Sequence, residues 1–279
     1  MKRSINAWAF PKDMTFEEIF KLAKDSGFEA IELNVDAVGA NAHSFNFNTT
    51  DEVFDEVNAL KKKYGIEVQS VSTGLYWIYG TFAHEDEAKL GEALRIIRTQ
   101  LKCAAAIGAE AILVVTSPVK EFGLERSFDN TVRVFKSLKD EIAASGVTVG
   151  IENVGNNFFT SAMDYKYLID AIGDENVGMY FDVGNMMAYS CPEWWIDIIG
   201  KYILKIHVKD YKRNNGCHTG GGFGRLLKGD INWDVLSPLI AKYYDGAITA
   251  EVTMTADDTA EEFFSYTNEA IKTIIAKAN

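Results

Sequence analysis

The sequence predicts an α/β protein that folds as a single (β/α)8 barrel, the TIM-barrel architecture, and three observations support this prediction. Short runs of β-branched and aromatic residues alternate with longer helical patterns along the whole chain, which is typical of parallel strands joined by right-handed crossovers. The length of 279 residues suits one such barrel. Polar residues recur at the ends of the last four strands. An open, doubly wound sheet is the alternative, and it would divide those polar residues across a switch point.

The first four strand–helix units are expected between residues 4 and 145. Strands are predicted at 4–10, 29–36, 67–73 and 111–117, and helices at 15–27, 50–65, 85–108 and about 125–145. The first helix has clear start and stop signals, because Thr15 and Glu18 form a capping box and Gly27 follows the last apolar position. The second helix likewise begins at a cap and ends at a glycine.

The last four strands carry the most informative residues. These strands are predicted at 147–153, 177–185, 203–210 and 247–252, followed by helical patterns at roughly 161–172, 193–200, 233–244 and 257–277. In each strand the apolar residues come first and a polar residue stands at or near the C-terminal end: Glu152, Asp182, His207 and Glu251. Because all strands of a parallel barrel open at one mouth, where barrel enzymes keep their chemistry, these side chains are expected to converge.

Three carboxylates and one imidazole form a ligand set for a divalent cation. Carboxylate oxygen suits Mg²⁺ and Mn²⁺, and an imidazole extends the choice to Co²⁺ and Zn²⁺. We therefore expect one divalent metal ion, with Mn²⁺ ahead of Mg²⁺, Co²⁺ and Zn²⁺. Taken singly, a glutamate at a strand end is more often a salt-bridge or cap partner, and the histidine can be a satisfied core residue. The equivalent positions of all four favour the metal site.

One domain is expected over residues 1–279, with the Gly-rich segment 210–232 as a loop over the C-terminal mouth. This segment is the longest irregular stretch and is basic within an acidic protein, and long connections of this kind are often functional. It is expected to act as a lid or a substrate-binding loop. Arg213, Arg225 and Lys228 beside its glycines suit a phosphate group, although a solvated basic loop is the simpler interpretation.

Composition narrows the class of partner and the location. A net charge of −12 argues against nucleic-acid binding, and fits a small-molecule partner. The three cysteines form no CxxC motif, so reduced thiols in a cytoplasm are the simpler interpretation. The N-terminal apolar stretch is broken at Asn6 and ends at Pro11, too short for a signal peptide. No stretch approaches the roughly 18 apolar residues of a membrane span, and the sequence leaves a homo-oligomer open.

Four motifs in the second half carry a resemblance to a known family. They are IEN at 151–153, FDVGN at 181–185, HVKD at 207–210 and AEV at 250–252. In this order the chain resembles the xylose isomerase-like superfamily of sugar and sugar-phosphate isomerases and epimerases, and within it the ketose 3-epimerases and L-xylulose-5-phosphate 3-epimerases. The resemblance also includes the segments IGAEAILVV at 107–115 and GDINW at 229–233.

The resemblance implies a metal-dependent epimerase that inverts a carbon next to the carbonyl of a ketose or ketose phosphate. In such enzymes the ion binds the carbonyl oxygen and the adjacent hydroxyl, and the reaction passes through a metal-stabilised enediolate. Glu152 and Glu251 would then be the catalytic pair, one removing the proton and the other returning it on the opposite face. Asp182 and His207 would serve only as ligands.

Substrate-binding residues are implied with less specificity. Arg213 stands six residues after His207, where ketose 3-epimerases place a substrate-binding arginine. Asn185 stands where those enzymes commonly have a histidine, which puts a free ketose substrate in doubt. Lys209 either contacts substrate or pairs with the adjacent aspartate. Trp8 is expected to wall the sugar, and Glu32, near the end of the second strand, is a further pocket residue.

Other activities remain open at this point. A dehydratase or lyase acting on an inosose-like or keto-sugar substrate begins with the same proton abstraction, and so does an aldose–ketose or hydroxypyruvate isomerase. The DNA-repair nuclease branch of the superfamily needs more metal ligands, whereas only His207 of the four histidines lies in a ligand motif. A barrel without activity is disfavoured, because three carboxylates at one mouth repel each other without a cation.

Overall fold

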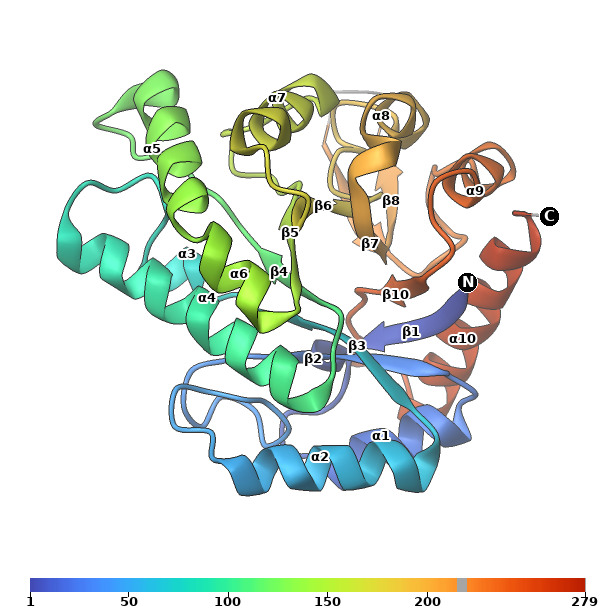
Figure 1. The fold of residues 1–279 in the computed structure, drawn as a ribbon. Coiled ribbons are helices and arrows are strands. Elements are labelled where there is room, and N and C mark those ends of the chain that lie inside the picture. The colour runs from blue at the N-terminus through green and yellow to red at the C-terminus, as the bar shows by residue number, and fades with distance from the viewer. Residues whose placement is uncertain (215–219, 279) are drawn as a thin grey trace.

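Eight parallel strands close into a barrel in the computed structural model, which describes residues 1–214 and 220–278 (Figure 1). Hydrogen-bonded neighbours follow the order β1-β10-β7-β6-β5-β4-β3-β2 and return to β1. The strands are β1 (Lys2–Asn6), β2 (Ala30–Asn34), β3 (Glu67–Ser72), β4 (Ala111–Val114), β5 (Thr148–Glu152), β6 (Val177–Asp182), β7 (Ile203–Val208) and β10 (Ala247–Ala250). The predicted TIM barrel is confirmed.

Helices follow the barrel strands and surround them (Figure 1). They are α1 (Phe16–Asp25), α2 (Asp51–Tyr64), α3 (Tyr76–Tyr79), α4 (Glu87–Ile107), α5 (Gly123–Ser137), α6 (Lys139–Ser145), α7 (Ala162–Ile172), α8 (Pro192–Ile199), α9 (Trp233–Ala241) and α10 (Ala260–Ala276), with short 3-10 turns at Ala7–Ala9 and Gly200–Tyr202. None of the helices in the described part of the chain is long and apolar enough to cross a membrane.

The local signals that define the first helix act as the sequence indicates. Thr15 and Glu18 form the capping box, with the backbone N–H of Thr15 donating to Oε2 of Glu18 at 2.7 Å. The second helix ends at Gly65, whose φ of 62° lies in the left-handed region that glycine adopts without strain. These caps fix where each helix leaves the strand before it.

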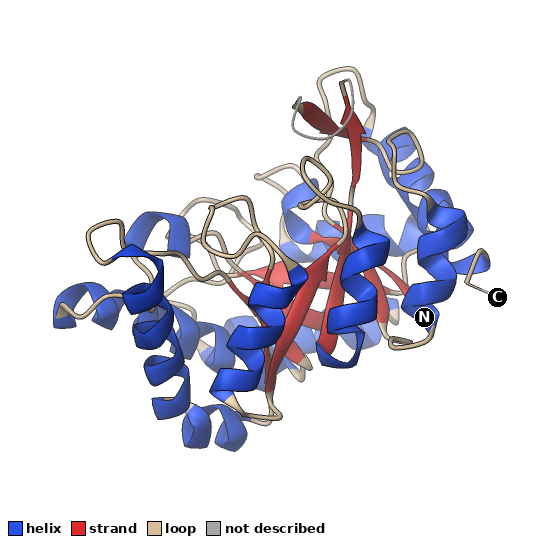
Figure 2. Ribbon diagram, turned by 90° about the horizontal axis from the view of Figure 1, so that it is seen from above, coloured by secondary structure: helices blue, strands red, loops and turns tan. Residues whose placement is uncertain are grey.

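Several segments differ from the sequence-based expectation. The first strand, expected at 4–10, runs from Lys2 to Asn6, and a 3-10 turn occupies Ala7–Ala9. The helix expected at about 125–145 begins at Gly123 and is divided at Leu138 into α5 and α6. A short additional helix, α3, precedes α4. The segment 210–232 is not irregular throughout, because β8 (Asp210–Arg213) and β9 (Gly221–Gly224) pair as an antiparallel hairpin that stands above the rim of the barrel (Figure 2). Residues 215–219 of that segment, which include Cys217 and His218, lie outside the described residues.

The hairpin could not be predicted from strand propensity, because its second strand consists mostly of glycine. The run GGFG of β9 lacks the β-branched residues that mark a strand. Glycine is nevertheless required at Gly221, because a Cβ atom there would lie 2.2 Å from the carbonyl oxygen of Lys212 on the paired strand. Close approach of the two backbones, and not flexibility, therefore explains this glycine.

Inside the barrel, a small residue on β5 makes room for a large one on β6. A Cβ atom at Gly150 would lie 2.9 Å from Cβ of Tyr180. The Tyr180 ring is fully buried, and its centroid lies 4.5 Å from that of the His207 ring. Gly150 thus permits the packing that covers one side of His207.

Two glycine substitutions should have opposite effects on stability. Gly150→Ala should lower the free energy of unfolding by about 1–3 kcal/mol, because the added methyl group overpacks the interior against Tyr180. Gly91→Ala in the exposed face of α4 should raise it by about 0.5–1 kcal/mol, since nothing lies within 4 Å of the new Cβ atom. Thermal unfolding of both variants and the wild type tests this, and equal shifts in the same direction would contradict it.

Candidate metal centre and active site

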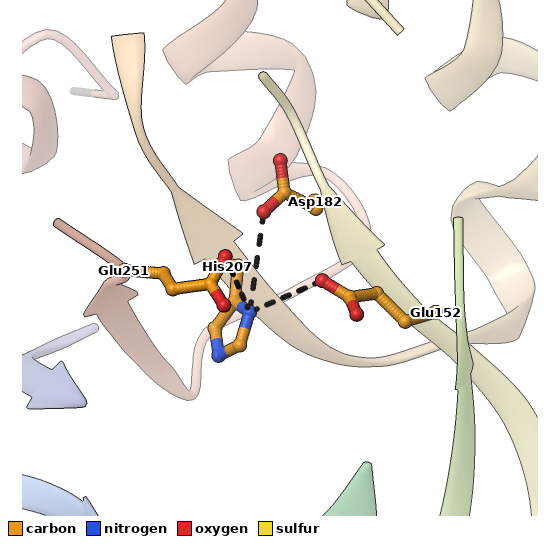
Figure 3. A group of neighbouring side chains, drawn as sticks. All are labelled: Glu152, Asp182, His207 and Glu251. Atoms are coloured by element: carbon orange, nitrogen blue, oxygen red, sulfur yellow. Dashed lines mark ion pairs between the residues drawn. The ribbon is translucent and has the colours of Figure 1, made fainter. Parts of the chain in front are cut away.

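Four ligand-type side chains from consecutive barrel strands meet at the C-terminal mouth (Figure 3). Glu152 and Asp182 are the last residues of β5 and β6, His207 lies next to the end of β7, and Glu251 directly follows β10. One ligand atom from each lies within 4.8 Å of the others. The sequence-based expectation that these four converge is therefore met in the geometry of the barrel.

Nδ1 of His207 is the central atom of this group. It lies 3.5 Å from Oε1 of Glu152, 4.0 Å from Oδ2 of Asp182 and 3.8 Å from Oε2 of Glu251. The side chains of Asp182 and His207 are fully buried, that of Glu152 is nearly so, and that of Glu251 is 23% exposed. Glu251 is thus the member of the cluster that meets the solvent.

Backbone amides hold Asp182 with one oxygen free. Its Oδ1 accepts hydrogen bonds from the N–H groups of Gly184 at 2.8 Å and Asn185 at 2.9 Å, so Oδ2 is left to face His207. The turn that supplies these amides packs closely on Lys209, and a Cβ atom at Gly184 would lie 2.6 Å from Cγ of that lysine. The glycine of the FDVGN motif is therefore needed for close packing.

The chemistry of the buried polar atoms fits a divalent ion. Among the residues that the structure describes, the buried Nδ1 of His207 has no hydrogen-bond partner, and the buried Oδ2 of Asp182 has only the ion pair with the Lys209 ammonium group at 3.0 Å. Buried polar atoms without partners are rare and need an explanation. Metal–ligand distances of about 2.0–2.2 Å place ligand atoms roughly 3–4.4 Å apart, which is close to the separations around His207. The residues present therefore fit one ion.

The pKa shifts of these residues also fit a cation-binding site. Burial raises the pKa of Glu152 to about 7 and also raises the pKa of Asp182. Burial acts in the same direction on Glu251, but the ammonium group of Lys209 outweighs it and lowers the pKa of Glu251. For His207, burial acts to lower the pKa, and the carboxylates of Glu32 and Glu152 raise it well above its usual value. The cluster therefore retains protons at neutral pH that a cation would displace.

Lys209 contacts the same oxygens that a metal ion would use. Its Nζ atom pairs with Oε2 of Glu251 and lies 3.0 Å from Oδ2 of Asp182. Asp210, the alternative partner considered from the sequence, instead accepts a hydrogen bond from Nε1 of Trp233 at 3.2 Å. Lys209 thus belongs to the ligand cluster, where its charge reduces the repulsion between the two carboxylates.

Two of the residues expected to bind substrate, Trp8 and Asn185, lie beside the cluster. Trp8 lines a cavity beside Glu251, and its Nε1 donates to Asp36 at 3.1 Å. Asn185 donates to the carbonyl oxygen of Asn153 at 2.8 Å and lies 3.4 Å from Oε1 of Glu152. Both residues are therefore next to the cluster.

Arg213 and Glu32 point elsewhere. The guanidinium group of Arg213 donates to the backbone carbonyls of Met187 and Ser190, so it braces the loop between β6 and α8. Glu32 is fully buried beneath the mouth and contacts Nε2 of His207 at 2.6 Å. In the described structure, neither residue lines the cavity beside Glu251.

That cavity has a volume of about 420 Å³, which lies in the range of small-molecule sites. Its walls come from β1, the β8–β9 hairpin and the loop after β10, and include Trp8, Lys209, Phe223, Arg225 and Glu251. The hairpin therefore supplies one wall of the cavity, through Phe223 and Gly224.

Several residues that support the site were not identified as functional from the sequence. Asn153 pairs with the backbone N–H and C=O of Asp182, both at 2.8 Å, and so joins β5 to β6. Ser70 and Tyr180 both donate to Oε2 of Glu32. Only Asn153 has a local cue, since it follows Glu152 in the IEN motif, whereas the other contacts join strands far apart in the sequence.

Comparison with known proteins identifies the family of this chain. Residues 20–269 match the family described as xylose isomerase-like TIM barrel. A protein of Haemophilus influenzae, provisionally named L-ribulose-5-phosphate 3-epimerase SgbU, is 23% identical over 207 residues, which cover 72% of this chain and 70% of that protein. The sequence-based resemblance to the family is thereby confirmed.

Solved structures show the same fold. The IOLI protein, whose crystal structure contains a bound zinc atom, has a TM-score of 0.82 at 15% identity, covering 100% of this chain and 99% of that one. The structure of an L-ribulose 3-epimerase has a TM-score of 0.78 at 14% identity, covering 99% and 95%. At these identities the likeness establishes the barrel, and the site rests on the residues described above.

Metal binding should be stoichiometric and should release protons. Chelator-stripped protein should bind one Mn²⁺ per chain, with an affinity that falls by at least about tenfold per pH unit as the pH decreases below about 7, because Glu152 and His207, whose pKa values are both raised, must lose protons to bind the ion. Calorimetric titrations at several pH values, in buffers of different ionisation enthalpy, measure both quantities. Asp182→Asn should weaken binding at every pH, whereas an affinity independent of pH would contradict the prediction.

Proposed function

The chain belongs to the xylose isomerase-like TIM barrel family, and on that basis we propose that it is a divalent-metal-dependent epimerase of ketoses or ketose phosphates. The observation that carries this proposal is the convergence of Glu152, Asp182, His207 and Glu251 around one point at the mouth of the barrel. The relatives named above support the class of reaction, since one is named as a sugar-phosphate 3-epimerase and another as a ketose 3-epimerase.

The two glutamates suit proton transfer on opposite faces of one carbon atom. Glu152 extends from β5 and Glu251 from the end of β10, two strands that β6 and β7 separate in the barrel (Figure 3). A bound divalent ion would polarise a substrate carbonyl and make the adjacent C–H more acidic. One glutamate then removes that proton, and the other delivers a proton to the opposite face, which inverts the centre. Each glutamate has a second carboxylate oxygen that would remain available for proton transfer if the first one held the ion.

Asp182 and His207 have a different role in this proposal. Both are fully buried, and Oδ1 of Asp182 is already committed to two backbone amides. Neither has a free oxygen or nitrogen to exchange protons with substrate once it binds the ion. They hold the ion, and their rigidity keeps the two glutamates at fixed distances from it.

The cavity beside Glu251 would bind the sugar chain. Trp8 and Phe223 provide apolar walls, while Lys209 and Arg225 provide donors toward the two ends. Arg225 pairs with Asp258, whose side chain is only 1% exposed, so its position is fixed. This arrangement suits a polyhydroxylated chain with a polar or phosphorylated end. Asn185 lies on the side of Glu152 and is the proposed donor to a hydroxyl there.

Exchange of hydrogen with solvent tests the proposed reaction. With Mn²⁺ bound, the wild type should incorporate deuterium from D₂O at the inverted carbon of its substrate, as measured by NMR over a panel of ketoses and their phosphates. Glu152→Gln and Glu251→Gln should each lower epimerisation by about 10²–10⁴-fold. Each should still exchange the proton of one epimer only, and the two variants should act on opposite epimers, because each retains one proton-transfer group.

The control is Asp182→Asn, which should lose exchange on both epimers together as the ion is lost. Exchange of both epimers by either glutamine variant at full metal occupancy would contradict the two-glutamate mechanism. Loss of water from the substrate would identify a dehydratase, and movement of the carbonyl group would identify an aldose–ketose isomerase.

Removal of Lys209 separates substrate binding from metal binding. Lys209→Met should raise KM or lower kcat by at least about tenfold, a loss of roughly 1.4 kcal/mol, because the cavity loses its donor beside Glu251. Its affinity for Mn²⁺ should not fall, since the ammonium group and the ion share Oδ2 of Asp182 and Oε2 of Glu251. Lys212→Met, on an exposed lysine paired with Asp230, is the matched control. Unchanged kinetics in Lys209→Met would remove it from the substrate site.

A further inference from the structure

Glu32 is a buried carboxylate that accepts hydrogen bonds from Asn6, Ser70 and Tyr180 and also contacts the ring of His207. Its Oε1 lies 2.6 Å from Nε2 of His207 and accepts a hydrogen bond from Nδ2 of Asn6 at 2.6 Å. Its Oε2 accepts from the Ser70 hydroxyl at 2.6 Å and from the Tyr180 hydroxyl. Both oxygens are therefore satisfied, which makes an ionised carboxylate tolerable in a site with no exposure to water.

The contact with Glu32 determines which ring nitrogen of His207 carries the proton. An ionised carboxylate only accepts hydrogen bonds, so Nε2 of His207 must carry the hydrogen that points to Glu32. A neutral imidazole with a proton on Nε2 presents its lone pair at Nδ1. Nδ1 is the nitrogen that faces Glu152, Asp182 and Glu251.

Among the described residues, Glu32 is the hydrogen-bond partner of the His207 ring, since Nδ1 has none. Tyr180 packs against the ring with an interplanar angle of 56°, and the hydroxyl group of the same residue donates to Glu32. Tyr180 therefore couples the position of the carboxylate to the orientation of the imidazole. Glu32 is fully buried and does not line the cavity, so it acts on the site through the side chains that it contacts and not through direct contact with a substrate.

We infer that Glu32 is a positioning residue of the metal centre, which fixes His207 with Nδ1 toward the three carboxylates and makes that nitrogen a stronger ligand. Carboxylates that accept a hydrogen bond from a metal-bound histidine generally have both effects. The inference rests on the proposed role of His207 as a ligand, and it is independent of the sugar and of the reaction.

The inference is tested by measuring metal affinity, which requires no substrate and no enzymatic activity. Mn²⁺ and Zn²⁺ are titrated calorimetrically into the chelator-stripped wild type, Glu32→Gln and Ser4→Ala. Glu32→Gln keeps the shape and removes the charge, and it should bind both ions about 10–100-fold more weakly. Ser4→Ala is the matched control, because Ser4 is equally buried in the barrel but makes no hydrogen bond to the described residues, and it should bind like the wild type.

A direct view of the imidazole distinguishes positioning from a general structural role. In ¹⁵N-histidine-labelled, Zn²⁺-loaded wild type, NMR should show His207 protonated at Nε2 and coordinated through Nδ1. Tyr180→Phe, which keeps the carboxylate and removes one donor to it, should retain this state and lose less than tenfold in affinity.

Three results would overturn the inference. Binding by Glu32→Gln within twofold of the wild type would show that Glu32 does not tune the site. Coordination through Nε2 in the wild type would do the same, and this measurement stands even when Glu32→Gln does not fold. Failure of the wild type to bind either ion would overturn the proposed metal centre together with the role of Glu32. The first two results, in contrast, would overturn only the role of Glu32.

Discussion

Mutual repulsion of three carboxylates around one imidazole nitrogen is the constraint on which this molecule depends. Groups of like charge within a few ångströms separate unless the backbone prevents it or a cation compensates them. Here the backbone is a closed ring of parallel strands, and Glu152, Asp182, His207 and Glu251 lie on four consecutive members of it. Lys209 and the ion that the cluster is proposed to bind supply the compensating charge.

Support for the cluster comes from layers of the barrel interior beneath it. Asn153 fixes the backbone of Asp182, and Glu32 contacts the far side of the His207 ring. Gly150 leaves the space that Tyr180 needs to reach both Glu32 and that ring. A change two residues below the mouth is therefore transmitted to the ligands through direct contacts, without a change in the ligands themselves.

The sequence predicts the barrel and the four ligands because each rests on a local pattern. A strand that ends in a polar residue can be recognised in a single stretch, and its place in the series follows from alternation. The role of Glu32 depends on a partner 175 residues away, and no spacing along the chain reveals that contact. The hairpin was missed because its second strand is mostly glycine, and the bracing role of Arg213 depends on backbone carbonyls, which have no sequence signature.

Closure of the ring also has a consequence for synthesis of the chain. β10 is the last of the eight barrel strands in chain order, and it must insert between β1 and β7 to complete the barrel. Glu251 follows that strand directly, so the cluster gains its fourth member only after the two ends of the sheet have met. An unfinished barrel thus lacks the complete four-residue cluster, so the proposed metal site would form only together with the closed fold.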